Sequence, residues 1–165
     1  MKQQALEYLK DRYQEESSRF SHLEEKCGRF ISLITIIIAV ITGILSVNSG
    51  EILRPKSEIE WISLSLFLLA YFTIVCCWGH SLSALKIQEI PVLPRSTATA
   101  DYIYNKDEAT SERYIYDAHK QTIHELTMTL NEKVKYLTLA YEELVISAWL
   151  LSIASVIEIY MEITK

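Results

Sequence analysis

Residues 142–158 read EELVISAWLLSIASVIE, and this stretch decides whether the C-terminal third of the chain can cross a membrane. Its uncharged part, residues 144–157, would form about 21 Å of helix, whereas the hydrocarbon core of a bilayer is about 30 Å thick. A span must therefore include Glu142 and Glu143 at one end or Glu158 at the other. Carboxylates at this depth are rare, and by default they indicate a polar pathway or a buried partner.

Two other uncharged apolar stretches, residues 30–47 and 61–79, each reach the length of a membrane span. The chain nevertheless carries 16 basic and 21 acidic side chains, and these are concentrated outside the three apolar stretches. The net charge of -5 disfavours direct nucleic-acid binding, because phosphate contacts need an excess of Lys and Arg. The sequence therefore predicts an integral membrane protein with the lipid bilayer as its first partner.

The Lys and Arg residues also predict an orientation. Going along the chain, 6 precede the first apolar stretch, 2 lie between the first and second, 7 lie between the second and third, and 1 follows the third. Cytoplasmic segments carry the excess of positive charge. We expect the N-terminus and residues 86–135 inside, and the short loop and the C-terminus outside.

Helical periodicity continues beyond the apolar stretches. The N-terminal segment has a heptad of apolar positions, which Glu16 interrupts: Leu6, Leu9, Tyr13, Phe20, Leu23, Cys27, Phe30 and Ile34. No proline occurs before residue 47, and none occurs from residue 107 to the third apolar stretch. We expect two cytoplasmic stalk helices, continuous with the first and third spans and packed in parallel, within one protomer or between neighbours.

The predicted fold is therefore an all-α membrane protein with three transmembrane helices and two long cytoplasmic stalk helices. It forms one domain, and residues 87–105, which contain Pro91 and Pro94, are expected to be an irregular loop. The predicted segments are a cytoplasmic helix (1–29), transmembrane helix 1 (30–48), an external loop (49–60), transmembrane helix 2 (61–80), a cytoplasmic loop (81–106), a cytoplasmic amphipathic helix (107–136) and transmembrane helix 3 (137–160).

Small and polar residues recur on one face of each span. The first face comprises Gly28, Ser32, Thr35, Ala39, Thr42 and Ser46; the second Ser63, Ala70, Thr73, Cys77, His80 and Ala84; the third Ala140, Glu143, Ser147, Ala154 and Glu158. These faces fit either close helix packing or, for the third, the lining of a water-filled path in an oligomer. The pore or gating candidates are Glu142, Glu143, Ser147, Glu158 and His80.

The topology places His80 where Glu142 and Glu143 enter the membrane. A pair between the histidine and a carboxylate there could hold a closed state, or both groups could simply mark the interface. Glu143 shares the small face, whereas Glu142 lies about 100° away around the helix.

No metal site, cofactor site or catalytic centre is expected from the motifs. One weak pattern remains, because Arg113 and His119 match the loose Arg-x4-6-His motif of HEPN ribonucleases. Within the loop, Arg95 could hold an anion, and Tyr102 and Tyr104 could stack on a base or on a partner.

The order of parts resembles small bacterial membrane effectors of antiphage defence. The phrases that carry the resemblance are EKCGRF, DYIYN and NEKVKYL, set between the apolar stretches. Transmembrane effectors of cyclic-pyrimidine (Pycsar) systems, SLATT-type effectors and the Cas13b-associated membrane pore protein are similar in plan.

This resemblance implies a homo-oligomer that permeabilises or depolarises the inner membrane when it is triggered from the cytoplasm. The trigger would be a cyclic nucleotide or a CRISPR or other defence complex. Two alternatives stay open: a non-enzymatic membrane anchor or scaffold for a soluble partner, and a membrane-tethered ribonuclease using Arg113 and His119.

Overall fold

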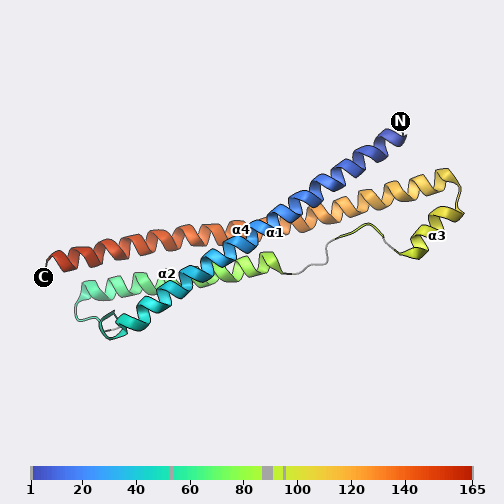
Figure 1. Cartoon of the computed structure of the whole chain (residues 1–165). Coiled ribbons are helices and arrows are strands. Elements are labelled where there is room, and N and C mark those ends of the chain that lie inside the picture. The colour runs from blue at the N-terminus through green and yellow to red at the C-terminus, as the bar shows by residue number, and fades with distance from the viewer. Residues whose placement is uncertain (1, 53, 87–90, 95, 165) are drawn as a thin grey trace. The chain divides into compact units, whose positions relative to one another are not determined.

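The computed structural model describes residues 2–52, 54–86, 91–94 and 96–164. Four helices and no strand occur in these residues: α1 (Lys2–Ile52), α2 (Glu58–Leu85), α3 (Thr97–Asn105) and α4 (Glu108–Ile163). Three of them, α1, α2 and α4, contain stretches that are long and apolar enough to cross a membrane. The prediction of an all-helical chain with three such helices is confirmed (Figure 1).

Local sequence explains where the shorter helices begin. The Ser57 hydroxyl accepts a hydrogen bond from the Glu60 N–H at the start of α2, and the Ser96 hydroxyl accepts one from the Thr99 N–H at the start of α3. At the start of α4 the Asp107 carboxylate accepts from the Thr110 N–H at 3.1 Å. Each side chain satisfies a backbone donor that lacks a partner within its helix.

The prediction of an irregular loop over residues 87–105 is wrong for its second part, because α3 occupies Thr97–Asn105. Pro91 and Pro94 exclude helix only around their own positions. The Ser96 cap then permits a helix immediately afterwards, and its end is fixed against α4, where the Ser111 hydroxyl donates to the Ile103 carbonyl at 2.9 Å.

The chain divides into two compact units. The first, here called the stalk unit, comprises Met1–Glu25 and Ile87–Lys133; the second, the bundle unit, comprises Lys26–Lys86 and Val134–Lys165. Both α1 and α4 contribute to both units. Each unit has its own buried cluster of apolar side chains, so each is described separately below.

In the stalk unit, α1 packs on α4 in parallel. Tyr13 contacts His119, Phe20 packs with Leu126 and Leu130, and Glu24 pairs with Lys133, so both sequences advance in the same direction. The expected parallel packing of the two stalk helices therefore occurs within one chain. Burying a side chain such as Leu126, which is 1 % exposed, contributes about 1.5–3 kcal/mol.

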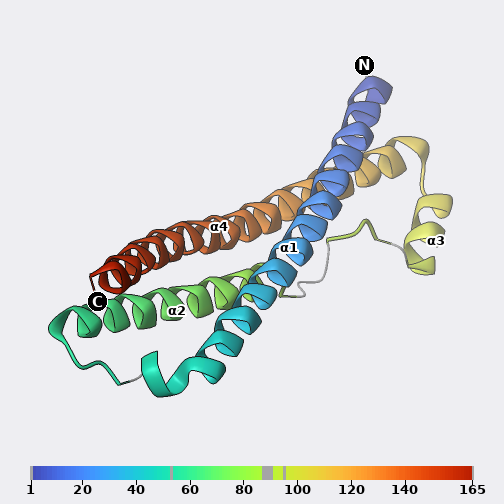
Figure 2. The same cartoon turned by 60° about the vertical axis from the view of Figure 1, so that its left-hand side comes forward.

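In the bundle unit, α2 runs antiparallel to both long helices. Its contacts with α4 pair Ser63 with Glu158 near one end and His80 with Glu143 near the other. Figures 1 and 2 both show α2 alongside the second half of α4. The interior contains Ile34, Ile41, Ile74, Cys77 and Ala140.

Packing of α1 in the bundle unit differs from the small-residue face expected in the first span. The packed face carries Cys27, Ile34 and Ile41, whereas Ser32, Thr35, Ala39, Thr42 and Ser46 are exposed. A methyl group added at Gly28 or Gly43 would meet no neighbouring atom within 4 Å. The heptad face of α1 is packed in preference to its small-residue face because isoleucine side chains bury more apolar area than Gly, Ala or Ser.

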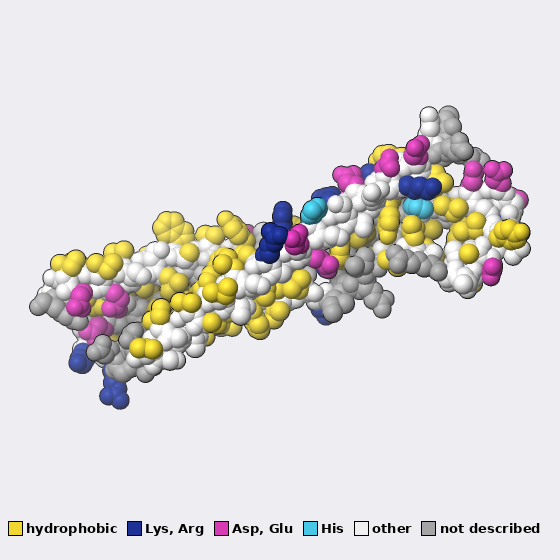
Figure 3. All heavy atoms as spheres, viewed as in Figure 1, with side chains coloured by type: hydrophobic (Ala, Val, Ile, Leu, Met, Phe, Trp, Pro, Cys, Tyr) yellow, Lys and Arg dark blue, Asp and Glu magenta, His cyan; other side chains and the backbone are white. Residues whose placement is uncertain are grey.

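Large apolar side chains also point outward from the bundle unit. Val40, Phe72, Trp149 and Val156 are each more than half exposed. In Figure 3 hydrophobic side chains cover much of the visible surface of this unit. A surface of this kind is compatible with contact with lipid.

Candidate functional site

The candidate site of the bundle unit is the contact between His80 of α2 and Glu143 of α4. The His80 Nε2 atom lies 3.4 Å from Glu143 Oε1, with side chains 37 % and 25 % exposed. The His80 ring also stacks on Tyr136, with ring centroids 6.4 Å apart and an interplanar angle of 26°. The structure thus brings together the histidine and the carboxylate that the predicted topology placed at the same membrane boundary.

Only one oxygen of the Glu143 carboxylate, Oε1, has a polar partner. Its Oε2 atom is buried and has no hydrogen-bond partner among the residues that the structure describes. Leaving such an acceptor unsatisfied costs about 1–3 kcal/mol. The neighbouring Glu142 is exposed, in agreement with its different position around the helix.

The other gating candidates of α4 behave differently from Glu143. Ser147 is 1 % exposed, and its hydroxyl donates to the Leu144 carbonyl of its own helix at 2.7 Å. Glu158 is exposed but accepts a 2.6 Å hydrogen bond from the buried Ser63 hydroxyl of α2. Ser147 is therefore an interior packing residue in this arrangement, and Glu158 connects two helices.

The small face of α2, in contrast with that of α1, is the packed face. Ser63, Ala70, Cys77 and Ala84 are all buried, and the Cys77 thiol donates to the Ala140 carbonyl of α4 at 2.9 Å. Small residues let α2 approach α4 closely enough for this direct bond from side chain to backbone.

Arg113 and His119 of the stalk unit do not converge. Arg113 is 86 % exposed and its guanidinium lies 4.0 Å from Asp117, whereas His119 is 8 % exposed. The His119 ring meets Tyr13 of α1 edge-on, with centroids 6.3 Å apart. A catalytic pair needs both groups within reach of one phosphodiester, so this geometry gives the ribonuclease alternative no support.

The structure describes two of the three loop candidates. Arg95 lies outside the described residues. Tyr102 contacts Tyr114 of α4, with ring centroids 5.1 Å apart, and the Lys106 ammonium lies 5.6 Å from the centre of the Tyr102 ring. Tyr104 is 89 % exposed. Tyr102 therefore attaches α3 to α4, and only Tyr104 presents a free ring.

Charged groups buried in the stalk unit were missed by sequence reasoning. Glu16, which interrupts the apolar heptad, is 2 % exposed and accepts hydrogen bonds from Arg12 at 3.0 Å and Arg19 at 3.1 Å. Lys133 is 3 % exposed, pairs with Glu24 at 2.9 Å and lies 4.1 Å from the centre of the Phe20 ring. The sequence did contain a signal for the burial of Glu16. Arg12 and Arg19 lie four residues before it and three residues after it, and residues at these spacings share one helix face and can pair.

The described residues contain no group of three or more His, Cys, Asp or Glu side chains placed to hold a metal ion. Comparison of the chain with known protein families, with curated proteins and with solved structures finds no match.

Proposed function

We propose that this chain is a membrane effector that permeabilises or depolarises the inner membrane when it is triggered from the cytoplasm. In this proposal the structure corresponds to the silent state. The contact between His80 and Glu143 holds α2 and α4 together, and its loss accompanies opening. The role in bacterial antiphage defence follows from the resemblance of the chain to small defence effectors.

The observation that carries the proposal is the buried Oε2 atom of Glu143, which has no hydrogen-bond partner among the residues that the structure describes. A partly exposed pair between a carboxylate and a protonated histidine contributes at most about 1 kcal/mol, whereas the buried Oε2 atom costs about 1–3 kcal/mol. The cost equals or exceeds the gain, so this contact adds no net stability to the closed state. A contact of this kind can be reversed by a modest input of free energy, which is what a switchable effector needs.

A path from trigger to membrane is available through two continuous helices. Each of α1 and α4 is one unbroken helix that belongs to both the stalk unit and the bundle unit. A change in how the two helices pack in the stalk unit would therefore be carried along them into the bundle. We assign the sensing role to the stalk unit and the membrane role to the bundle unit.

Assembly of several copies belongs to the same proposal. The small face of α1 is exposed in the single chain, with Ala39, Thr42 and Gly43 among its residues. Small residues permit close approach of helices within a membrane. Copies that associate through this face would place several bundle units around one centre, where a polar path could open.

Expression of variants in bacteria with a potential-sensitive dye tests the proposal. His80→Ala and Glu143→Gln each remove the contact and are expected to depolarise cells without an added trigger. Glu142→Gln, at an exposed neighbouring carboxylate, is the matched control and should leave the potential intact. Normal potential and growth with both contact variants, at expression equal to wild type, would refute the effector function.

A further inference from the structure

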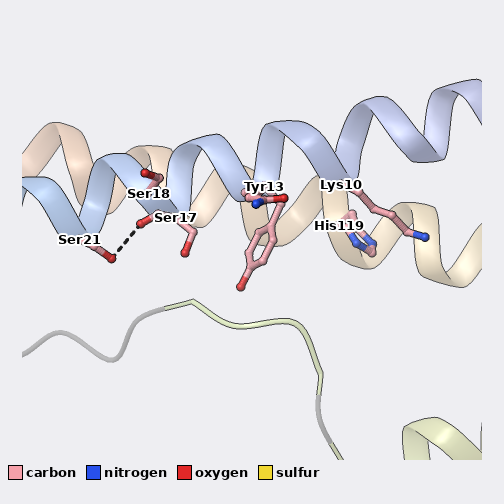
Figure 4. Close-up of a pocket in the computed structure, with 7 residues that line it drawn as sticks. Lys10, Tyr13, Ser17, Ser18, Ser21 and His119 are labelled. Carbon is pink, nitrogen blue, oxygen red and sulfur yellow. Dashed lines mark hydrogen bonds between the residues drawn. The ribbon is translucent and has the colours of Figure 1, made fainter.

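A shallow groove of about 450 Å³ lies on the stalk unit (Figure 4). One wall is a single face of α1 that runs from Lys10 to Ser21, and the other contribution is His119 of α4. The lining positions on α1 recur at steps of three and four residues, so they share this face. Figure 4 shows Lys10 and His119 at one end of the groove, Tyr13 beside them and Ser21 at the other end.

The groove is lined by groups that suit an anion. Besides His119, the described lining residues contribute the Lys10 ammonium, the Gln14 amide and the hydroxyls of Tyr13, Ser17, Ser18 and Ser21, and none of them is a carboxylate. The Ser21 hydroxyl donates to the Ser17 carbonyl at 3.2 Å, so towards a ligand it acts as an acceptor. Lys10 forms no ion pair with any residue that the structure describes. The nearby Glu16 carboxylate is already engaged by Arg12 and Arg19, so it does not neutralise Lys10.

The most informative lining group is the buried His119 ring. Its Nδ1 atom lies 2.8 Å from the Ile115 carbonyl, which can only accept, so Nδ1 carries the hydrogen. The Nε2 atom has no partner among the described residues. It accepts a hydrogen bond when the ring is neutral and donates one when the ring is protonated. A side chain that is 8 % exposed and held in this way is oriented in advance to accept a hydrogen bond from a ligand hydroxyl, such as the P–OH group of a singly charged phosphate.

We propose that this groove binds a small phosphorylated molecule. The phosphate lies at the end formed by Lys10 and His119, where the ammonium supplies the charge. The remainder of the molecule carries hydroxyls and lies along Ser17 and Ser21. The rise of a helix gives about 16 Å between Lys10 and Ser21, and the groove volume is in the range of small-ligand sites, about 300–1,000 Å³. A soluble metabolite and a lipid head group share this phosphate chemistry.

The binding site stands independently of the membrane activity, and only its regulatory meaning rests on the proposed function. A ligand here contacts α1 through Lys10 and α4 through His119, so it favours one packing of the two helices over another. These are the two helices that continue into the bundle unit. Binding and leakage are measured separately, so failure of one proposal is distinguishable from failure of the other.

Calorimetry on the full chain in detergent micelles tests the proposal, with inorganic phosphate, adenosine 5′-monophosphate and glycerol 1-phosphate as probes. We expect binding of phosphate-bearing probes and no binding of adenosine. Lys10→Gln should weaken binding at least about tenfold, since it removes the charged hydrogen-bond donor of the phosphate end. Lys120→Gln, at an exposed lysine of α4 outside the groove, should leave binding unchanged.

A further pair of measurements separates the two ends of the groove and the two sources of phosphate. The double variant Ser17→Ala, Ser21→Ala should weaken the nucleotide but not inorganic phosphate. Tighter binding of glycerol phosphate than of the nucleotide assigns the site to a lipid head group, and the reverse order assigns it to a soluble metabolite. Absence of binding at about 10 mM of every probe, or equal losses in Lys10→Gln and Lys120→Gln, would overturn the proposal.

Discussion

Replacing Glu143 by Gln should raise membrane leakage, whereas replacing it by Met should not. Both substitutions remove the charge that pairs with His80 across 3.4 Å. Gln keeps a polar atom at the buried position of Oε2, where the described residues offer no partner, whereas Met places an apolar group there. The comparison therefore separates the value of the ion pair from the cost of the unsatisfied oxygen.

The magnitudes follow from exposure and geometry. At 3.4 Å, with side chains 37 % and 25 % exposed, the pair with a protonated His80 contributes at most about 1 kcal/mol once solvent screening is included. Glu143→Gln loses this contribution and retains the unsatisfied group, so the closed state is destabilised by about 1 kcal/mol, or about fivefold in population. Glu143→Met also removes a cost of about 1–3 kcal/mol, so its closed state is at least as stable as that of the wild type.

Dye release from lipid vesicles at a fixed ratio of protein to lipid measures these changes. We expect the release rate of Glu143→Gln to rise about fivefold and that of Glu143→Met to equal or fall below that of the wild type. Adding His80→Ala to Glu143→Met should cause no further change, because the pair is already absent. Equal increases in both single variants would refute the reasoning, and so would additive effects of His80→Ala and Glu143→Gln.

Three other predictions concern stability, measured by circular dichroism of the full chain in detergent. Leu126→Ala should lower the free energy of unfolding by about 2–5 kcal/mol, since Leu126 is 1 % exposed. Met128→Ala, at a 55 % exposed site, should change the free energy of unfolding by less than about 0.5 kcal/mol. Similar losses in both variants would contradict the assigned packing. Hydrogen bonds from Thr110 lower the pKa of Asp107, so its stabilisation is present above the ordinary pKa of an aspartate and is lost as the pH falls through the lowered value. Asp107→Asn should retain the cap and lose that dependence on acid, and an unchanged acid profile would exclude this role. Ser63→Ala should lower the unfolding midpoint because it removes the 2.6 Å bond to Glu158, and no change would show that this bond is replaced by water.

The three long helices could be predicted from the sequence because their signals are local. Apolar stretches of sufficient length, the absence of internal proline and the heptad of α1 are properties of neighbouring residues. Of the predicted heptad positions, the structure buries Phe20, Cys27 and Ile34. The level at which His80 meets Glu143 follows from topology and helix length alone, and the structure places the two groups in contact.

Helix α3 and the buried charges were not predicted, for two different physical reasons. The Ser96 cap is a weak local signal that Pro91 and Pro94 masked, although it was present in the sequence. Glu16 looked like a break in the apolar seam, because a carboxylate is normally excluded from an interior unless other groups satisfy it. Its burial depends on two arginines of the same helix and on the position of α4.

By itself the sequence determined the helices, their apolar stretches and the phase that distinguishes Glu143 from Glu142, because each depends on residues within a few turns of one helix. Only the tertiary structure decided which face of each helix is buried. It turned the small face of α1 outward and that of α2 inward, left one Glu143 oxygen without a partner, and set His119 beside Tyr13 to form the groove. Those outcomes depend on which face of a helix packs against another helix, and the residues of that other helix are distant in the sequence.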